Sequence, residues 1–222
     1  MPCYAAAMRV FLIHGMGRTS ASMALLGRRL RQAGHVTSSF GYLVSRQSLD
    51  DIAGRWVEHI ERQRQQEQTP AEPFAVVGHS LGNVITRRAL PRLPSLSHFV
   101  MLAPPNHPPA MARALAASPV AGAFRALTQD AGRRLLDDDG AFYPGLPLPT
   151  VKTLIIAGDG GPRFARSPWK GAPNDSVVSV EETRLTGPLI EHVVVDAIHT
   201  LIMNQRDVAG LTLRFLAGGH AD

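Results

Sequence analysis

The stretch that most constrains the fold lies near the middle of the chain, where a short apolar run leads directly into Gly78-His79-Ser80-Leu81-Gly82. The run covers residues 74–77, and a helical pattern begins as soon as the second glycine is passed. A strand that turns sharply into a helix needs very small residues on both sides of the turn, because strand and helix approach closely there. The sequence therefore predicts a strand–turn–helix with the Ser80 hydroxyl exposed at the strand tip.

Two roles are open to Ser80 at this position. A serine before a helix often caps it, because its hydroxyl accepts a hydrogen bond from a backbone N–H of the first turn. A serine held in a sharp strand–helix turn can instead act as a nucleophile, with the backbone N–H of Leu81 directed at the oxyanion that forms. The apolar run before the turn and the helical pattern after it favour the nucleophile.

Apolar runs alternate with helical patterns along the rest of the chain. We expect strands at residues 9–13, 35–42, 74–77, 98–102, 151–157 and 192–195. We expect helices at residues 20–33, 49–66, 83–90 and 201–216. This alternation predicts an α/β fold with a mostly parallel, doubly wound sheet of about six strands. Residues 1–222 are expected to form one domain, in which the irregular stretch 108–145 is either a small helical cap or a packed surface connection.

Charge and composition exclude several classes of protein. The chain has 23 basic and 18 acidic residues, and its arginines are spread along helical patterns, which argues against a nucleic-acid partner. Its single cysteine, Cys3, rules out an internal disulfide framework and a cysteine-based metal cluster. No apolar run is long enough to span a membrane, and no secretory signal is evident, so we expect a cytoplasmic protein. The sequence is also compatible with peripheral contact of the protein with a membrane surface.

Polar residues that follow other strands are candidates for activating Ser80, because sites in open parallel sheets lie beyond the carboxyl ends of the strands. A serine hydroxyl needs a base to take its proton, and the base needs a third group to hold its tautomer. Among nine histidines, His199 is the best base, since it lies between the last strand and the last helix. Asp175 is the preferred acid because an apolar run anchors its loop, and Asp159 is the alternative.

The loop at residues 14–17, His14-Gly15-Met16-Gly17, offers a second oxyanion donor. Its first glycine lets the backbone turn the N–H of Met16 toward the site, opposite the N–H of Leu81. A dinucleotide-binding loop is the alternative, with Arg46 beside a phosphorylated ribose. That pattern lacks its third glycine, because Ser20 stands there, and no acid ends the second strand. The oxyanion role is therefore preferred, and neither a cofactor nor a metal is expected.

Taken together, these motifs resemble those of the α/β-hydrolases, in particular the small bacterial esterase/lipase group. The points of likeness are His14-Gly15-Met16-Gly17, Gly78-His79-Ser80-Leu81-Gly82, Leu102-Ala103-Pro104-Pro105-Asn106, Pro173-Asn174-Asp175, Val178-Ser179-Val180 and Ile198-His199-Thr200. The resemblance implies a minimal α/β-hydrolase fold with Ser80 as nucleophile, Asp175 as acid and His199 as base. Two positions depart from the family pattern. Ser176 stands where a glycine is expected, and His107-Pro108-Pro109 replaces a small Gly-Ser turn.

The resemblance also implies a function. The chain is similar to serine hydrolases, so the implied function is the cleavage of carboxylic esters through a Ser-His-Asp triad and an acyl-enzyme. The implied substrate is a small-molecule or lipid ester. The same triad would serve a thioesterase or an acyltransferase. A third possibility is a non-catalytic binding module on a hydrolase scaffold, against which the complete triad argues.

Overall fold

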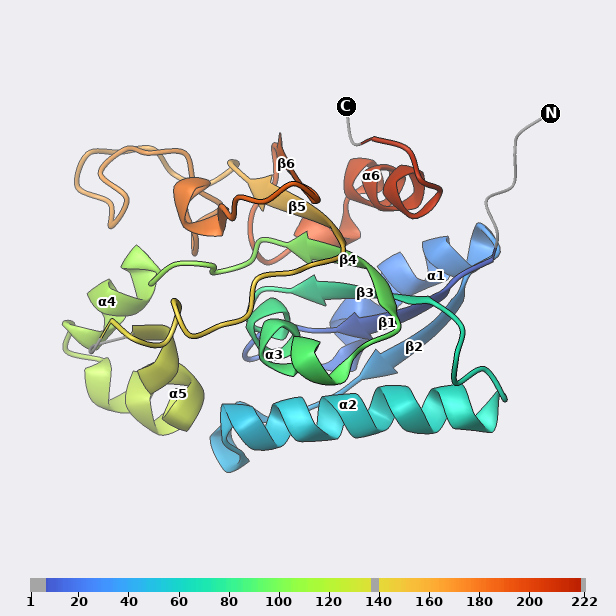
Figure 1. Cartoon of the computed structure of the whole chain (residues 1–222). Helices are drawn as coiled ribbons and strands as arrows, with labels where there is room; N and C mark the ends of the chain where they lie inside the picture. The colour runs from blue at the N-terminus through green and yellow to red at the C-terminus, as the bar shows by residue number, and fades with distance from the viewer. Residues whose placement is uncertain (1–6, 137–139, 221–222) are drawn as a thin grey trace.

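The computed structural model describes residues 7–136 and 140–220, so Cys3 and the acidic run at 137–139 lie outside the described residues. Six strands form one sheet in the order β2-β1-β3-β4-β5-β6, and every neighbouring pair is parallel (Figure 1). The strands are β1 (Arg9–Ile13), β2 (Val36–Phe40), β3 (Phe74–His79), β4 (Leu96–Leu102), β5 (Lys152–Gly158) and β6 (Ile190–Val195). The predicted α/β fold with a parallel six-stranded sheet is confirmed.

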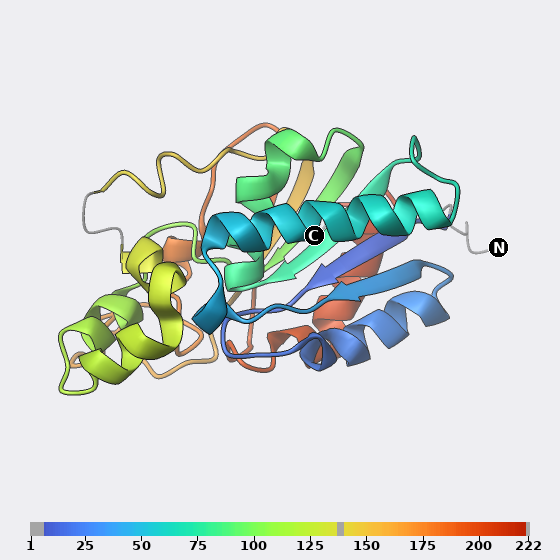
Figure 2. The same ribbon diagram turned by 90° about the horizontal axis from the view of Figure 1, so that it is seen from below.

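Helices cover both faces of the sheet, with α2 and α3 on one side and α1 and α6 on the other (Figures 1 and 2). The helices are α1 (Ala24–Gln32), α2 (Leu49–Gln66), α3 (Leu81–Ala89), α4 (Ala110–Ala116), α5 (Ala121–Leu136) and α6 (Arg206–Leu216). Successive side chains of a strand point to opposite faces. Phe11 and Ile13 of β1 therefore pack in the α2/α3 layer, whereas Val10 and Leu12 pack in the α1/α6 layer.

The last helix begins later than the sequence pattern predicts, at Arg206 instead of residue 201. Ile202 and Met203 are fully buried, but they belong to a short 3-10 turn, Ile202–Asn204, and not to the helix. Gln205 then takes an extended backbone (φ −71°, ψ 145°) that separates this turn from α6. Its side-chain amide donates to the Asp196 carbonyl at 3.1 Å. The predicted start of the helix is therefore wrong, because the backbone bends at Gln205.

The irregular stretch between β4 and β5 contains two helices, α4 and α5, which lie beyond the carboxyl ends of the strands (Figures 1 and 2). The path of α5 is kinked at Gln129, which has φ 48° and ψ −127°. These helices lie at the same edge of the sheet as the predicted site. That the stretch 108–145 acts as a cap over the site stays a prediction.

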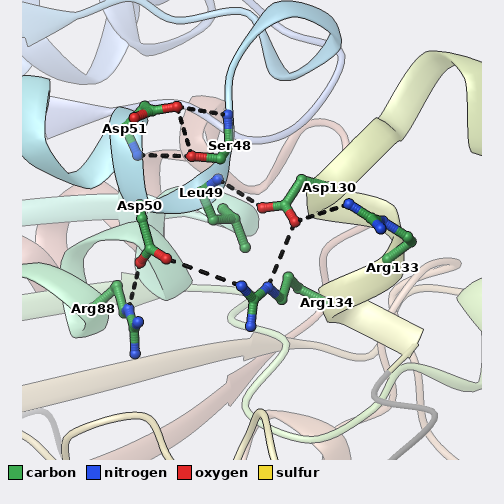
Figure 3. A network of polar contacts seen from close by, with 8 residues as sticks. All are labelled: Ser48, Leu49, Asp50, Asp51, Arg88, Asp130, Arg133 and Arg134. Atoms are coloured by element: carbon green, nitrogen blue, oxygen red, sulfur yellow. Dashed lines mark hydrogen bonds and ion pairs between the residues drawn. The ribbon is translucent and has the colours of Figure 1, made fainter.

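Polar contacts connect α5 to α2 and α3, two helices that pack on the sheet (Figure 3). The Asp130 carboxylate accepts a hydrogen bond of 2.9 Å from the N–H of Leu49, the first residue of α2, and pairs with Arg134 at 3.6 Å. Asp50 of α2 pairs with Arg88 of α3 at 2.6 Å and reaches Arg134 at 4.0 Å. We call these five residues the α5 anchor. The anchor joins α5 to two helices that pack on the sheet.

Candidate active site

Ser80 occupies a strained backbone conformation between β3 and α3, with φ 51° and ψ −123°. Residues with a side chain rarely take a positive φ, so the surrounding structure must hold this conformation in place. Two backbone hydrogen bonds do so. The Ser80 N–H donates to the Leu102 carbonyl at the end of β4 at 2.9 Å, and the Ser80 carbonyl accepts from the Asn83 N–H at 3.0 Å. The turn is therefore fixed by the neighbouring strand and by the first turn of α3.

The two glycines of the turn are required by close contacts, as the sequence predicts. A Cβ added at Gly78 would lie 2.3 Å from the side-chain oxygen of Asn83. A Cβ at Gly82 would lie 2.7 Å from the carbonyl oxygens of both Ile13 and His14. A side chain at either position would force the backbone apart, because real contacts of this kind are longer. The glycines thus allow α3 to begin directly against the loop that follows β1.

His199 and Asp175 are in direct contact. The Nδ1 atom of His199 lies 2.7 Å from Oδ2 of Asp175, and the His199 N–H donates to the Asp175 carbonyl at 2.8 Å. The fully buried Asp175 carboxylate also accepts from the N–H groups of Val177 and Val178, at 2.9 and 2.7 Å. Since a carboxylate accepts at Nδ1, the proton of the neutral ring lies there, and Nε2 carries the free lone pair. That is the tautomer that a general base requires.

The two acid candidates have different partners. Asp159 forms an ion pair with the Arg163 guanidinium, and its N–H donates to the Val195 carbonyl at 3.0 Å. Asp175 alone of the two contacts His199. Gly158, the last residue of β5, permits this arrangement, because an added Cβ would lie 2.9 Å from the Asp175 Cβ. The structure thus brings together the preferred acid and the preferred base.

The loop at residues 14–17 packs against the Ser80 turn. A Cβ added at Gly15 would lie 2.9 Å from the Ser80 Cβ and 2.9 Å from Nδ1 of His79. Met16, the expected second oxyanion donor, follows directly and is partly buried. Leu81, the other expected donor, is the first residue of α3. The loops that carry the two expected donors therefore meet beside Ser80.

Tyr42 holds His14, the first residue of this loop, although the sequence analysis did not select Tyr42. The Tyr42 hydroxyl donates to the His14 carbonyl at 2.8 Å, and its ring stacks on the imidazole with centroids 4.3 Å apart. His14 Nδ1 lies 2.8 Å from the Gly15 carbonyl, while Nε2 accepts from the Tyr42 N–H at 3.3 Å. Burial lowers the pKa of His14, which agrees with a neutral ring that donates at Nδ1.

His79 is a second residue whose contacts the sequence did not indicate. Its Nε2 lies 3.0 Å from the His199 carbonyl oxygen, so it donates there, and the two imidazole centroids are 4.9 Å apart. Burial lowers the pKa of His79 well below its usual value, and the neighbouring His199 lowers it further. His79 is therefore a neutral support for the backbone of His199. The sequence showed it only as a residue of a tight turn.

The two departures from the family pattern have visible structural effects. Ser176 has φ 83°, a conformation that glycine adopts more readily. Its N–H donates to the Asn174 side-chain oxygen at 2.9 Å, which holds the turn that follows Asp175. His107 and Pro108 line a pocket of about 380 Å³. The substituted turn after β4 therefore forms a pocket wall.

The His199–Asp175 pair contacts His79, the residue before Ser80, and two loops that carry backbone amides meet at Ser80. Such groups are suited to proton transfer and to stabilising an anion. Within residues 7–136 and 140–220, no group of three His, Cys, Asp or Glu side chains is arranged to hold a metal ion. Over those same two ranges, no helix is both long and apolar enough to cross a membrane.

Several solved structures share this fold. The mature form of a lipase from Bacillus licheniformis, BlEst2, matches with a TM-score of 0.76 over 95% of this chain and 92% of its own, at 17% identity. A monoacylglycerol lipase of Paleococcus ferrophilus has a TM-score of 0.66 over 95% and 94%, at 16% identity. The NocB thioesterase domain from the nocardicin cluster has a TM-score of 0.59 over 97% and 96%, at 14% identity. At such identities the likeness establishes the fold alone.

The sequence comparison is more specific about the family. No curated protein matches the chain significantly. The sequence profile described as "Alpha/beta hydrolase family", however, matches residues 10–221. This range runs from β1 past the end of α6 and includes Ser80, Asp175 and His199. The sequence motifs, the parallel sheet and this match agree, and the chain belongs to the alpha/beta hydrolase family.

Proposed function

We propose that this protein is a serine hydrolase that cleaves carboxylic esters, with Ser80 as nucleophile, His199 as base and Asp175 as acid. The observation that carries the proposal is the 2.7 Å contact between His199 Nδ1 and Asp175 Oδ2, in a buried pair. The contact leaves the basic Nε2 of His199 free. The strained turn at Ser80 and the family membership support the same conclusion.

In the proposed reaction, the Ser80 oxygen attacks the carbonyl carbon of the ester while Nε2 of His199 takes the hydroxyl proton. The carbonyl oxygen becomes an oxyanion, which the N–H groups of Met16 and Leu81 stabilise. When this intermediate collapses, the bond to the alcohol oxygen breaks and His199 returns the proton to the departing alcohol. Water then attacks the acyl-enzyme by the same route, which releases the carboxylic acid and restores Ser80.

Asp175 supports both halves of this cycle. Its carboxylate holds the Nδ1 proton of His199 and stabilises the imidazolium that forms when Nε2 takes up a proton. The N–H groups of Val177 and Val178 keep the carboxylate in place while the charge on the imidazole changes. The neutral His79 beside the ring adds no positive charge that would oppose the imidazolium.

Two of the structural neighbours, the Bacillus licheniformis and Paleococcus ferrophilus proteins, are lipases, which favours an ester as substrate. The NocB domain, a thioesterase, favours the alternative of a thioester substrate on the same triad. A comparison of kcat/KM for an ester and its matched thioester separates an esterase from a thioesterase. Turnover with competing water, alcohol and thiol acceptors, followed by product analysis, separates either from an acyltransferase. A dominant transfer to alcohol or thiol would replace the esterase assignment.

Replacement of Ser80 by alanine tests the proposal directly. We expect Ser80→Ala to lower kcat for 4-nitrophenyl butyrate by about 10⁶-fold, because the nucleophile is lost while binding remains. A fluorophosphonate probe is expected to label the native protein and not the variant. Ser95→Ala is the matched control, since Ser95 precedes β4 and so lies at the opposite edge of the parallel sheet.

Circular dichroism and thermal melting show whether each variant is folded. Unchanged turnover in folded Ser80→Ala would reject Ser80 as the nucleophile. A folded native protein that neither turns over esters nor takes the label would instead favour the non-catalytic binding module.

A further inference from the structure

A pocket of about 550 Å³ opens beside the loop that follows β1. His14 lines it from that loop, and Ser20 lines it from the turn before α1. Tyr42 and Arg46 line it from the segment between β2 and α2, and Arg55 from α2 itself. We call it the arginine pocket. It lies at the carboxyl edge of the sheet, the edge that carries the candidate active site.

The described residues that line the arginine pocket carry positive charge and no negative charge. Arg46 and Arg55 both line it, and none of its described lining residues is a carboxylate. The Arg55 guanidinium donates to the Gln47 side-chain oxygen at 2.7 Å and lies 5.8 Å from the Phe40 ring. These contacts orient the Arg55 guanidinium and do not neutralise its charge. The Arg46 guanidinium has neither a hydrogen bond nor an ion pair with any described residue. Two such cations in one pocket attract an anion.

The two acidic residues that lie between Arg46 and Arg55 in the sequence, Asp50 and Asp51, have partners elsewhere (Figure 3). Asp51 accepts from the hydroxyl of Ser48, at 2.7 Å, within the capping box of α2. Asp50 belongs to the α5 anchor, where it pairs with Arg88 at 2.6 Å. Both carboxylates are therefore held by other groups at the start of α2, which leaves the arginines of the pocket to a ligand.

The pocket is connected to the candidate active site through His14. The imidazole of His14 lines the pocket, and the next residue, Gly15, packs against Ser80. A third guanidinium, that of Arg18, adds positive charge beside the segment that carries His199. Arg18 donates to the carbonyl of Thr200, the residue that follows His199. A substrate held at Ser80 would thus have positive charge near its reacting end and a positive pocket within reach.

We propose that the arginine pocket binds a carboxylate or phosphate group carried by the substrate, so that anionic esters are the preferred substrate class. This inference rests on the proposed function, because it assigns the pocket to the substrate of Ser80. The guanidinium groups of Arg46 and Arg55 provide donors in the planar arrangement that suits such oxyanions. The hydroxyls of Thr19 and Ser20, which also line the pocket, provide further donors.

Matched pairs of esters test the preference. For an anion on the acyl side, 4-nitrophenyl hydrogen glutarate is compared with 4-nitrophenyl butyrate. For an anion on the alcohol side, the butyrate ester of glycerol 3-phosphate is compared with glycerol monobutyrate. We expect the native protein to have a higher kcat/KM for the anionic ester than for the neutral ester in at least one pair. The pair that shows this preference identifies whether the anion lies on the acyl or the alcohol side of the substrate.

The double variant Arg46→Gln/Arg55→Gln is expected to lower the anionic-to-neutral ratio of kcat/KM by about tenfold, mainly through the KM of the anionic ester. Arg28→Gln is the matched control, because Arg28 is exposed on α1 and does not line the pocket. It is expected to leave the ratio unchanged, although it also removes a positive charge. The native preference should also weaken with added salt.

The outcomes separate this inference from the proposed function. Hydrolysis of neutral esters that depends on Ser80, with no preference for anionic esters or with a preference that survives the double variant, would overturn the pocket assignment alone. If no ester is hydrolysed, the proposed function fails, and calorimetric titration with glutarate and with inorganic phosphate decides about the pocket. Binding that the double variant loses supports an anion site, and an absence of binding to the native protein overturns it.

Discussion

At the scale of single residues, the contact that distinguishes Asp175 from Asp159 is its bond to His199. In Asp175→Asn the amide cannot stabilise the imidazolium and permits the wrong tautomer of His199. We expect kcat/KM for 4-nitrophenyl butyrate to fall by about 10³- to 10⁴-fold.

Asp159→Asn is the matched control for this prediction, because it removes the same charge from the same connection between β5 and β6. Asp159 pairs with Arg163 near the surface, so its loss should change kcat/KM by less than about threefold. Steady-state kinetics on both folded variants check the assignment. A larger loss in Asp159→Asn than in Asp175→Asn would reverse the identity of the acid.

At the scale of elements, the α5 anchor determines how firmly α5 is held to the sheet. Asp130 contributes a partly buried carboxylate that accepts from the first N–H of α2, a donor without a partner inside its own helix. We expect Asp130→Ala to lower the free energy of unfolding by about 1 kcal/mol. Amide hydrogen exchange should also become faster across α5.

Arg133→Ala is the control at this scale. Arg133 lies on α5, contacts Asp130 at 3.4 Å and is 76% exposed, so its ion pair should contribute little to stability. Hydrogen exchange followed by mass spectrometry compares the two variants with the native protein. Equal protection of α5 in Asp130→Ala and in the native protein would show that apolar packing, not the anchor, holds the helix.

At the scale of the whole molecule, the fully buried histidines make stability depend on pH. Burial lowers the pKa values of His14 and His79 below the ordinary value of 6.5. Below pH 6.5 the unfolded chain therefore binds protons at these rings that the folded protein does not. The stabilisation is fully present above pH 6.5 and is lost as the pH falls toward the folded pKa values, by up to about 1.4 kcal/mol per residue and pH unit.

Guanidinium denaturation between pH 7.5 and 5.5 measures this loss. We expect the midpoint to fall with pH in the native protein. His220→Asn serves as the control, because the ring of His220 is 84% exposed and its replacement leaves both buried rings in place. A midpoint that stays constant or rises as the pH is lowered would contradict the prediction.

Local patterns explain why much of the architecture could be predicted. Residues 49–66 were expected to form a helix from apolar spacing alone, and α2 spans Leu49–Gln66. The sharp turn at Ser80 was expected from its two glycines, which are required by contacts within a few residues and with the neighbouring loop. Where the backbone bent without a composition signal, as at Gln205, the predicted boundary was wrong by several residues.

The sequence by itself determined the alternation of strands and helices, the strained serine turn and the short set of candidate acids and bases, because side-chain periodicity and backbone sterics are local properties. Only the tertiary structure decided which candidates meet. The contact of His199 with Asp175 spans 24 positions, and its contact with His79 spans 120. The positive charge of the arginine pocket likewise depends on loops that converge at one edge of the sheet, a property that no single stretch of sequence contains.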